Sequence, residues 1–115
     1  MRYLMLAAAL LLVTLPAAAQ EKAFAPSATV SLAVTATTGR VQIQSGSNSP
    51  HARLYNGGAG TVFVNCGGDA VVATTAAGMP VPAGVVEVIA CPQPYIAALT
   101  ASGTSTLYIT VGSGI

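Results

Sequence analysis

The clearest alternation between hydrophobic and polar positions runs over residues 28–37. Apolar side chains occupy every second position there, and mostly threonine or serine stands between them. A period of two sustained over this run, with many β-branched side chains, predicts a β-strand with one buried face. A second short alternating run follows at residues 41–44, after a break at Gly39-Arg40.

Short apolar runs separated by turn residues continue to the end of the chain. They predict further strands over residues 52–55, 61–66, 70–74, 85–91, 95–101 and 105–111. Asn56-Gly57-Gly58 predicts a hairpin turn, because Asn and Gly accept positive φ. The segment Gly78–Gly84 contains two prolines and is expected to be a loop. We expect strand 85–91 to be buried and the last two strands to form a hairpin around Ser102-Gly103.

The number and spacing of these strands set the fold class. No window after the first twenty residues combines helical spacing with helix caps. About eight short strands predict an all-β fold, a single antiparallel β-sandwich or small barrel over residues 20–115. Aromatic residues are scarce, so Phe63, Tyr55 and Tyr108 are the large side chains expected in the core or at an interface.

The first nineteen residues have the pattern of a secretory signal peptide. Arg2 supplies a positive charge, Leu4–Leu15 is an uncharged and mainly apolar run, and Ala17-Ala18-Ala19 offers small residues for cleavage before Gln20. The apolar run is too short to span a bilayer core of about 30 Å. We therefore expect residues 1–19 to be a leader rather than a stable membrane anchor, and the protein to be exported to the periplasm or secreted.

Two cysteines, Cys66 and Cys91, follow the leader. An even number of cysteines in an exported chain predicts one disulfide, worth roughly 3 kcal/mol in the chain-entropy model. The alternative is a pair of buried thiols. A zinc site is not expected, since two cysteines without accompanying histidines do not complete a ligand set.

Charge is scarce and balanced. Only 6% of the residues are charged and the formal net charge is +1, while residues 20–115 carry equal numbers of basic and acidic side chains. No basic surface is available to bind phosphates, so a nucleic-acid partner is not expected. Neutral copies repel each other weakly, which favours self-association into a homo-oligomer or a larger lattice.

The side chains that usually carry chemistry are nearly absent. The single histidine, His51, lies in a turn-rich stretch and is expected at the surface. Asp69 and Glu87 are isolated acids of the kind that are usually solvated. The segment Gly57–Gly60 lacks the Lys-Ser/Thr pair and the helix of a phosphate-binding loop. We expect no catalytic, cofactor-binding or metal site, and no cofactor.

The last predicted strand is the expected contact surface. Leu107, Ile109 and Val111 share one face, and Tyr108 points to the other. We expect Leu107, Tyr108 and Ile109 to contribute to the contact between subunits.

From about Phe24 onward the chain carries a succession of segments found together in one group of proteins. They are Ala25-Pro26-Ser27-Ala28-Thr29-Val30, Ala52-Arg53-Leu54-Tyr55-Asn56, Thr61-Val62-Phe63-Val64, the run from Thr74 to Val88 and the ending from Ile96 to Ile115. This succession resembles small, mostly uncharacterised proteins encoded by tailed bacteriophages and prophages. The resemblance implies a β-rich, virion-associated piece, such as a head-decoration or tail-associated subunit. A leader and a cysteine pair depart from that pattern, because capsid parts assemble in the cytoplasm. Either the leader is used and this copy has an exported role, or the leader belongs to an over-extended reading frame and the protein is located in the virion.

Two functions follow. The leading expectation is a non-enzymatic virion-associated structural or decoration subunit that acts through protein–protein contacts. The alternative is an exported β-sandwich, periplasmic or at the cell surface, that binds a protein or glycan partner. Sugar binding usually requires exposed aromatic rings, and the few aromatic residues of the chain weaken that alternative.

Overall fold

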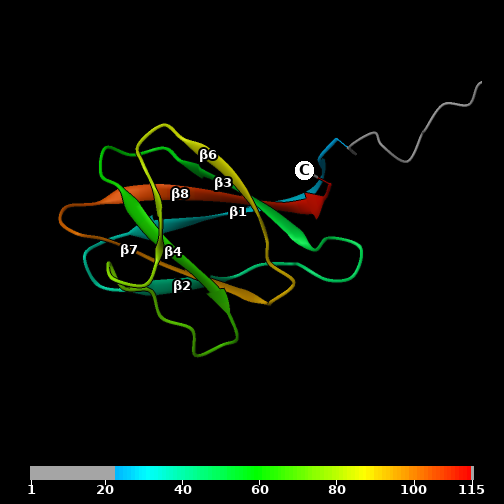
Figure 1. Cartoon of the computed structure of the whole chain (residues 1–115), viewed down its shortest axis with the longest axis horizontal. Coiled ribbons are helices and arrows are strands. Elements are labelled where there is room, and N and C mark those ends of the chain that lie inside the picture. The colour runs from blue at the N-terminus through cyan, green and yellow to red at the C-terminus, as the bar shows by residue number, and fades with distance from the viewer. Residues whose placement is uncertain (1–22, 115) are drawn as a thin grey trace, which may run out of the picture.

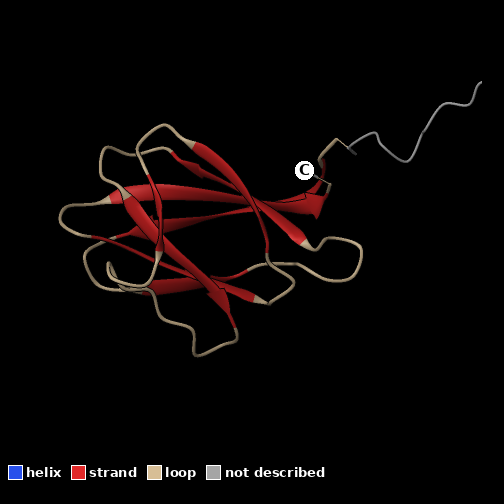
Figure 2. Cartoon of the chain, viewed as in Figure 1, coloured by secondary structure: helices blue, strands red, loops and turns tan. Residues whose placement is uncertain are grey.

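The computed structural model describes residues 23–114, which contain strands and connecting segments but no helix (Figure 2). The eight strands are β1 (Ala25–Val34), β2 (Gly39–Gln42), β3 (His51–Asn56), β4 (Val62–Gly67), β5 (Met79–Val81), β6 (Val86–Ala90), β7 (Tyr95–Thr100) and β8 (Ser105–Ser113). The predicted leader, residues 1–19, lies outside the described residues. Within residues 23–114, no helix is long and apolar enough to cross a membrane.

The strands form two antiparallel four-stranded sheets that pack face to face (Figure 1). Sheet A has the order β1-β8-β3-β6, and sheet B has the order β2-β7-β4-β5. The chain is therefore folded back on itself in nested pairs: β1 with β8, β2 with β7, β3 with β6 and β4 with β5. This is the strand order of an eight-stranded jelly roll. The prediction of a single all-β sandwich of about eight short strands is confirmed.

The core lies between the sheets and is built from alternate strand positions. Leu54 of β3 and the trio Leu107, Ile109 and Val111 of β8 face inward from sheet A. Sheet B contributes Val62, Val64, Val81, Ile96 and Ala98. The period of two along β8 therefore predicted the buried face of that strand correctly.

Two strand predictions are wrong near the edge of sheet B. Residues 70–74 form no strand, whereas Met79–Val81, expected to be part of a loop, is strand β5. Pro80 has no N–H to donate, which made a loop the natural expectation. A short strand at a sheet edge tolerates proline, because only one side of that strand is paired.

The predicted burial of strand 85–91 is also wrong in part. Strand β6 is the edge of sheet A, and Val86 and Glu87 are exposed. A continuous apolar run predicts a strand that is buried on both of its faces. At the edge of a sheet, however, much of each face of the strand remains exposed to solvent. Cys91, one residue after the strand, is fully buried.

The two predicted hairpins are wrong, because the chain changes sheet at both turns. The segment after Asn56 leads from β3 in sheet A to β4 in sheet B, and the Ser102-Gly103 turn leads from β7 in sheet B to β8 in sheet A. Positive φ occurs at Gly84, Gly103 and Gly114 among residues 23–114. Positive φ, which the sequence suggested as the reason for glycine at positions 57 and 58, therefore does not explain either residue.

Close approach of the backbone to Ser105 explains Gly58. A Cβ at Gly58 would clash with the Ser105 Oγ and would lie 2.6 Å from the Ser105 Cα. We expect Gly58→Ala to lower the free energy of unfolding by about 2–3 kcal/mol, because the backbone of β8 would have to move. Urea unfolding followed by far-ultraviolet circular dichroism measures this loss. In the control Gly60→Ala, the nearest atom is 3.6 Å from the new Cβ, so we expect a loss below about 1 kcal/mol. Equal losses would contradict the close-approach explanation.

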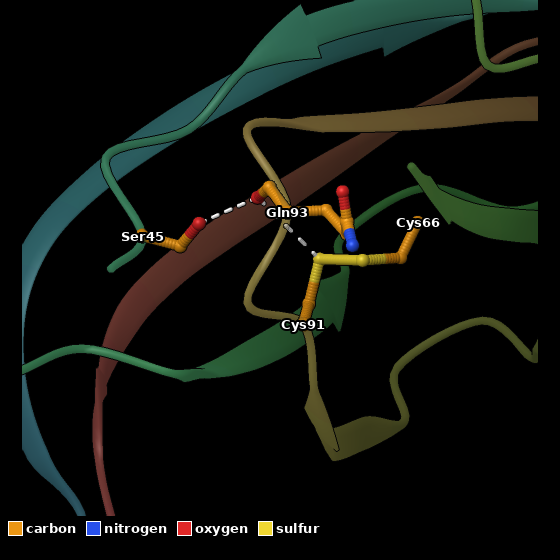
Figure 3. Close-up of a disulfide and its surroundings, with 4 residues drawn as sticks. All are labelled: Ser45, Cys66, Cys91 and Gln93. Atoms are coloured by element: carbon orange, nitrogen blue, oxygen red, sulfur yellow. Dashed lines mark hydrogen bonds between the residues drawn. A yellow bond between two sulfur atoms is a disulfide. The ribbon is translucent and has the colours of Figure 1, made fainter. Parts of the chain in front are cut away.

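The Cys66–Cys91 disulfide joins the two sheets (Figure 3). Cys66 lies in β4 of sheet B, Cys91 follows β6 of sheet A, and their Cα atoms are 6.0 Å apart. The N–H of Cys91 donates to the Pro50 carbonyl oxygen at 2.8 Å, and the Ser45 hydroxyl donates to the Gln93 carbonyl oxygen close by. The predicted disulfide is confirmed, and it is compatible with an exported protein.

Candidate interaction surface

The outer faces of the two sheets differ in what covers them. The segment 68–78 runs over the outer face of sheet B (Figure 1): the Asn65 Nδ2 donates to the Val72 carbonyl oxygen at 3.1 Å, and the Ala73 N–H donates to the Thr38 hydroxyl at 3.0 Å. Ala97 faces outward on β7, between the inward-facing Ile96 and Ala98, yet it is fully buried. Sheet B is therefore covered partly by its own chain.

Sheet A presents an open face that carries three of the four large exposed hydrophobic side chains among residues 23–114. Tyr55, Val86 and Tyr108 are 38%, 40% and 43% exposed, and Val72 of the segment over sheet B is the other large exposed hydrophobic residue described. Cross-strand register places Val86 of β6 opposite Tyr55 of β3, and Tyr55 opposite Tyr108 of β8. These three residues form one row across the sheet. We call this row, together with Arg53, the tyrosine face.

The two tyrosine rings make a preformed platform. Their centroids are 6.0 Å apart and their planes meet at 23°, a stacked arrangement. Gly57 lies against both rings, since a Cβ there would be 2.9 Å from the Tyr108 Cε2 and 3.3 Å from the Tyr55 Cε2. Rings that are already held in place lose little conformational entropy when a partner binds.

Polar groups border the platform on the next row of the sheet. Arg53 is exposed and lies between Val88 of β6 and Thr110 of β8, neither of which is charged. The Thr110 hydroxyl is hydrogen-bonded at 2.8 Å to the hydroxyl of Thr29 on β1. An aromatic centre beside an arginine and hydroxyl groups has the composition that protein interfaces favour.

The structure leaves only Tyr108 of the three predicted contact residues at the surface. Leu107 and Ile109 are fully buried in the core, so these two side chains are not available for the contact between subunits that the sequence predicted. Strand β8 is moreover a central strand, paired with β1 on one side and with β3 on the other. The terminal position of this strand in the sequence had suggested an edge, but jelly-roll order places the last strand inside the sheet.

Val86 and Arg53 are the members of the tyrosine face that the sequence did not single out for a contact, whereas Tyr55 was expected in the core or at an interface and is exposed. The alternation Arg53, Tyr55 on the solvent side of β3 was the available signal. The register between β3, β6 and β8 joins residues far apart in the chain, and no local pattern contains that register.

The remaining candidate residues do not come together. His51, expected at the surface, begins β3 and is half-buried, and its Nδ1 is buried without a hydrogen-bond partner in the described part of the chain. Asp69 and Glu87 are both exposed, the first in the segment over sheet B and the second on β6. Residues 23–114 contain no pocket and no group of three or more potential metal ligands.

Comparison with family models, with curated proteins and with solved structures found no match to this chain.

Proposed function

We propose that the chain is a non-enzymatic, virion-associated structural or decoration subunit that docks on a protein partner through its tyrosine face. The observation that carries this proposal is the contrast between the two sheets. One outer face is partly covered by the chain itself, and the other exposes a stacked tyrosine pair, a valine and an arginine in adjacent rows.

The chemistry of the tyrosine face suits a protein partner. Tyrosine and arginine are the residue types that most often dominate binding energy at protein interfaces, and they are concentrated near the interface centre. The balanced charge of residues 20–115 suits close packing of many copies on a repeated lattice. The jelly roll occurs in viral capsid domains, but a fold alone does not assign a function, so the proposal rests on the face and on the resemblance to phage proteins.

Replacing Tyr108 tests the docking face. We expect Tyr108→Ser to reduce the number of copies on purified particles at least about tenfold, because removing a central aromatic contact typically costs 2 kcal/mol or more. Quantitative mass spectrometry of particles assembled with the variant measures this occupancy. Circular dichroism checks that Tyr108→Ser and the control variant Val72→Ser are folded.

The matched control is Val72→Ser. Val72 is 51% exposed, but it lies on the segment over sheet B, away from the tyrosine face. We expect occupancy close to that of the unmodified chain. Loss of occupancy in the control with retention in Tyr108→Ser would place the docking surface on the other side of the sandwich and overturn the proposal.

The stacked tyrosines also favour a second candidate, an exported module that binds a glycan or a protein at the cell surface. Two exposed rings side by side offer the stacking surface that a sugar requires, and the disulfide is compatible with export. The intact mass of the product from its native host separates the candidates. A species that begins at Gln20 and is found only outside the cell, and that binds an oligosaccharide through Tyr55 and Tyr108, would favour the second.

A further inference from the structure

The four sheet edges differ in their protection against pairing with another strand. Strand β2 has four residues and includes Arg40, β5 has three and includes Pro80, and β6 has five and includes Glu87. Shortness, charge and proline are the usual means by which edges avoid pairing. Strand β1 has ten residues and no charged side chain, and its one proline, Pro26, lies at the beginning.

The free part of β1 is residues 28–34. A register shift lies between Pro26 and Ala28, and there the hydroxyl of Ser49, in the loop between β2 and β3, donates to the Ser27 hydroxyl at 3.2 Å. Beyond that point, residues 28–34 are paired with β8 on one side, and β1 is the last strand of sheet A on the other. Alternate N–H and C=O groups therefore point away from the sheet along this run.

We propose that residues 28–34 of β1 pair, antiparallel, with the same residues of a second copy of this chain, about a two-fold axis at Ser31. A second copy is the favoured occupant because the edge is uncharged, so identical strands meet without repulsion. Ser31 is the midpoint of the free run. This register sets Val30 opposite Leu32 of the second copy, and both are half-buried side chains on the core side of the sheet.

This pairing would join the two A sheets into one continuous eight-stranded sheet. Because Ser31 lies opposite Tyr108 in the β1–β8 register, the two copies of Tyr108 would stand on the same outer face, three strand spacings or roughly 14 Å apart. The dimer would thus present two tyrosine faces side by side and bind a repeated lattice bivalently. The pairing itself does not depend on which partner the tyrosine face takes.

A charge at the centre of the proposed contact tests it in solution. Ser31 is exposed on the outer face, so Ser31→Lys leaves the core intact, but it places two ammonium groups opposite each other across the axis. We expect the unmodified chain to have the mass of a dimer in light scattering at about 100 µM, and Ser31→Lys to dissociate at least about tenfold more readily. Gln42→Lys adds the same charge to edge strand β2 of sheet B and should leave the dimer unchanged.

A cysteine at the same position tests the register. Directly opposed residues have Cβ atoms about 4.5–5.5 Å apart, so Ser31→Cys should form an intermolecular disulfide on mild oxidation, while Gln42→Cys should not. The native cysteines do not interfere, because both are in the internal disulfide.

Three results would overturn the proposal: a monomeric unmodified chain at this concentration, a dimer that Ser31→Lys leaves intact, or the absence of an intermolecular disulfide in oxidised Ser31→Cys. None of these measurements uses particles. A failure here is therefore distinct from a failure of the tyrosine face to dock.

Discussion

Replacing Asn56 with aspartate is expected to lower the free energy of unfolding by about 3–5 kcal/mol. Asn56 is fully buried at the end of β3. Its Nδ2 donates to the carbonyl oxygens of Gly60 and Val81, both at 2.7 Å, and its Oδ1 accepts from the Gly58 N–H and the Ser105 hydroxyl. An aspartate carboxylate has no N–H, so its second oxygen would face two carbonyl oxygens in a site that is fully buried.

Urea unfolding followed by circular dichroism measures this loss, and Asn65→Asp provides the control. The Asn65 Nδ2 also donates to a backbone carbonyl, that of Val72, but Asn65 is only half-buried and makes this single side-chain bond on the outer side of sheet B. We expect that variant to lose about 1 kcal/mol or less. Similar losses in the two variants would show that the buried network around Asn56 does not hold the connection between the sheets.

Removal of the disulfide is the second large effect. The double variant Cys66→Ala, Cys91→Ala should be less stable by about 3 kcal/mol, because the unfolded chain regains the freedom of a loop with a sequence separation of 25. The bridge joins sheet A to sheet B, so its loss also frees the two sheets at that end of the sandwich. For a domain of this size the midpoint of thermal unfolding should fall by roughly 15–20 °C.

Thermal unfolding with and without a reducing agent provides the measurement and its control. Reductant should lower the midpoint of the unmodified chain towards that of the double variant and leave the variant unchanged. A midpoint that does not respond to reductant in the unmodified chain, at a concentration that reduces the bridge, would contradict a stabilising role for it.

The alternation of side chains predicted much of the fold because burial on one side of a strand is a local property. Leu107, Ile109 and Val111 face the core and Tyr108 faces solvent, as the period of two along β8 indicates. The same pattern does not say which strand lies next to which. Both predicted hairpins therefore failed where the chain crosses from one sheet to the other.

The candidate site was less predictable because its parts come from separate segments. Tyr55, Val86 and Tyr108 meet only through the register of three strands. The contrast with the outer face of sheet B depends on segment 68–78, which packs there through contacts with residues far from it in the chain. Asn56 shows the same limit: as part of an Asn-Gly-Gly sequence it indicated a turn, whereas its side chain also binds groups from two distant segments of the chain, at Val81 and Ser105.

Mass spectrometry of purified phage particles from the native host, with copy numbers determined against the major capsid protein, is the most direct test of the proposed function. A structural or decoration subunit should be present in many copies per particle. Its occupancy should fall in Tyr108→Ser and persist in Val72→Ser. Recovery of the chain only from the exported fraction, as a species beginning at Gln20, with none in particles, would contradict it.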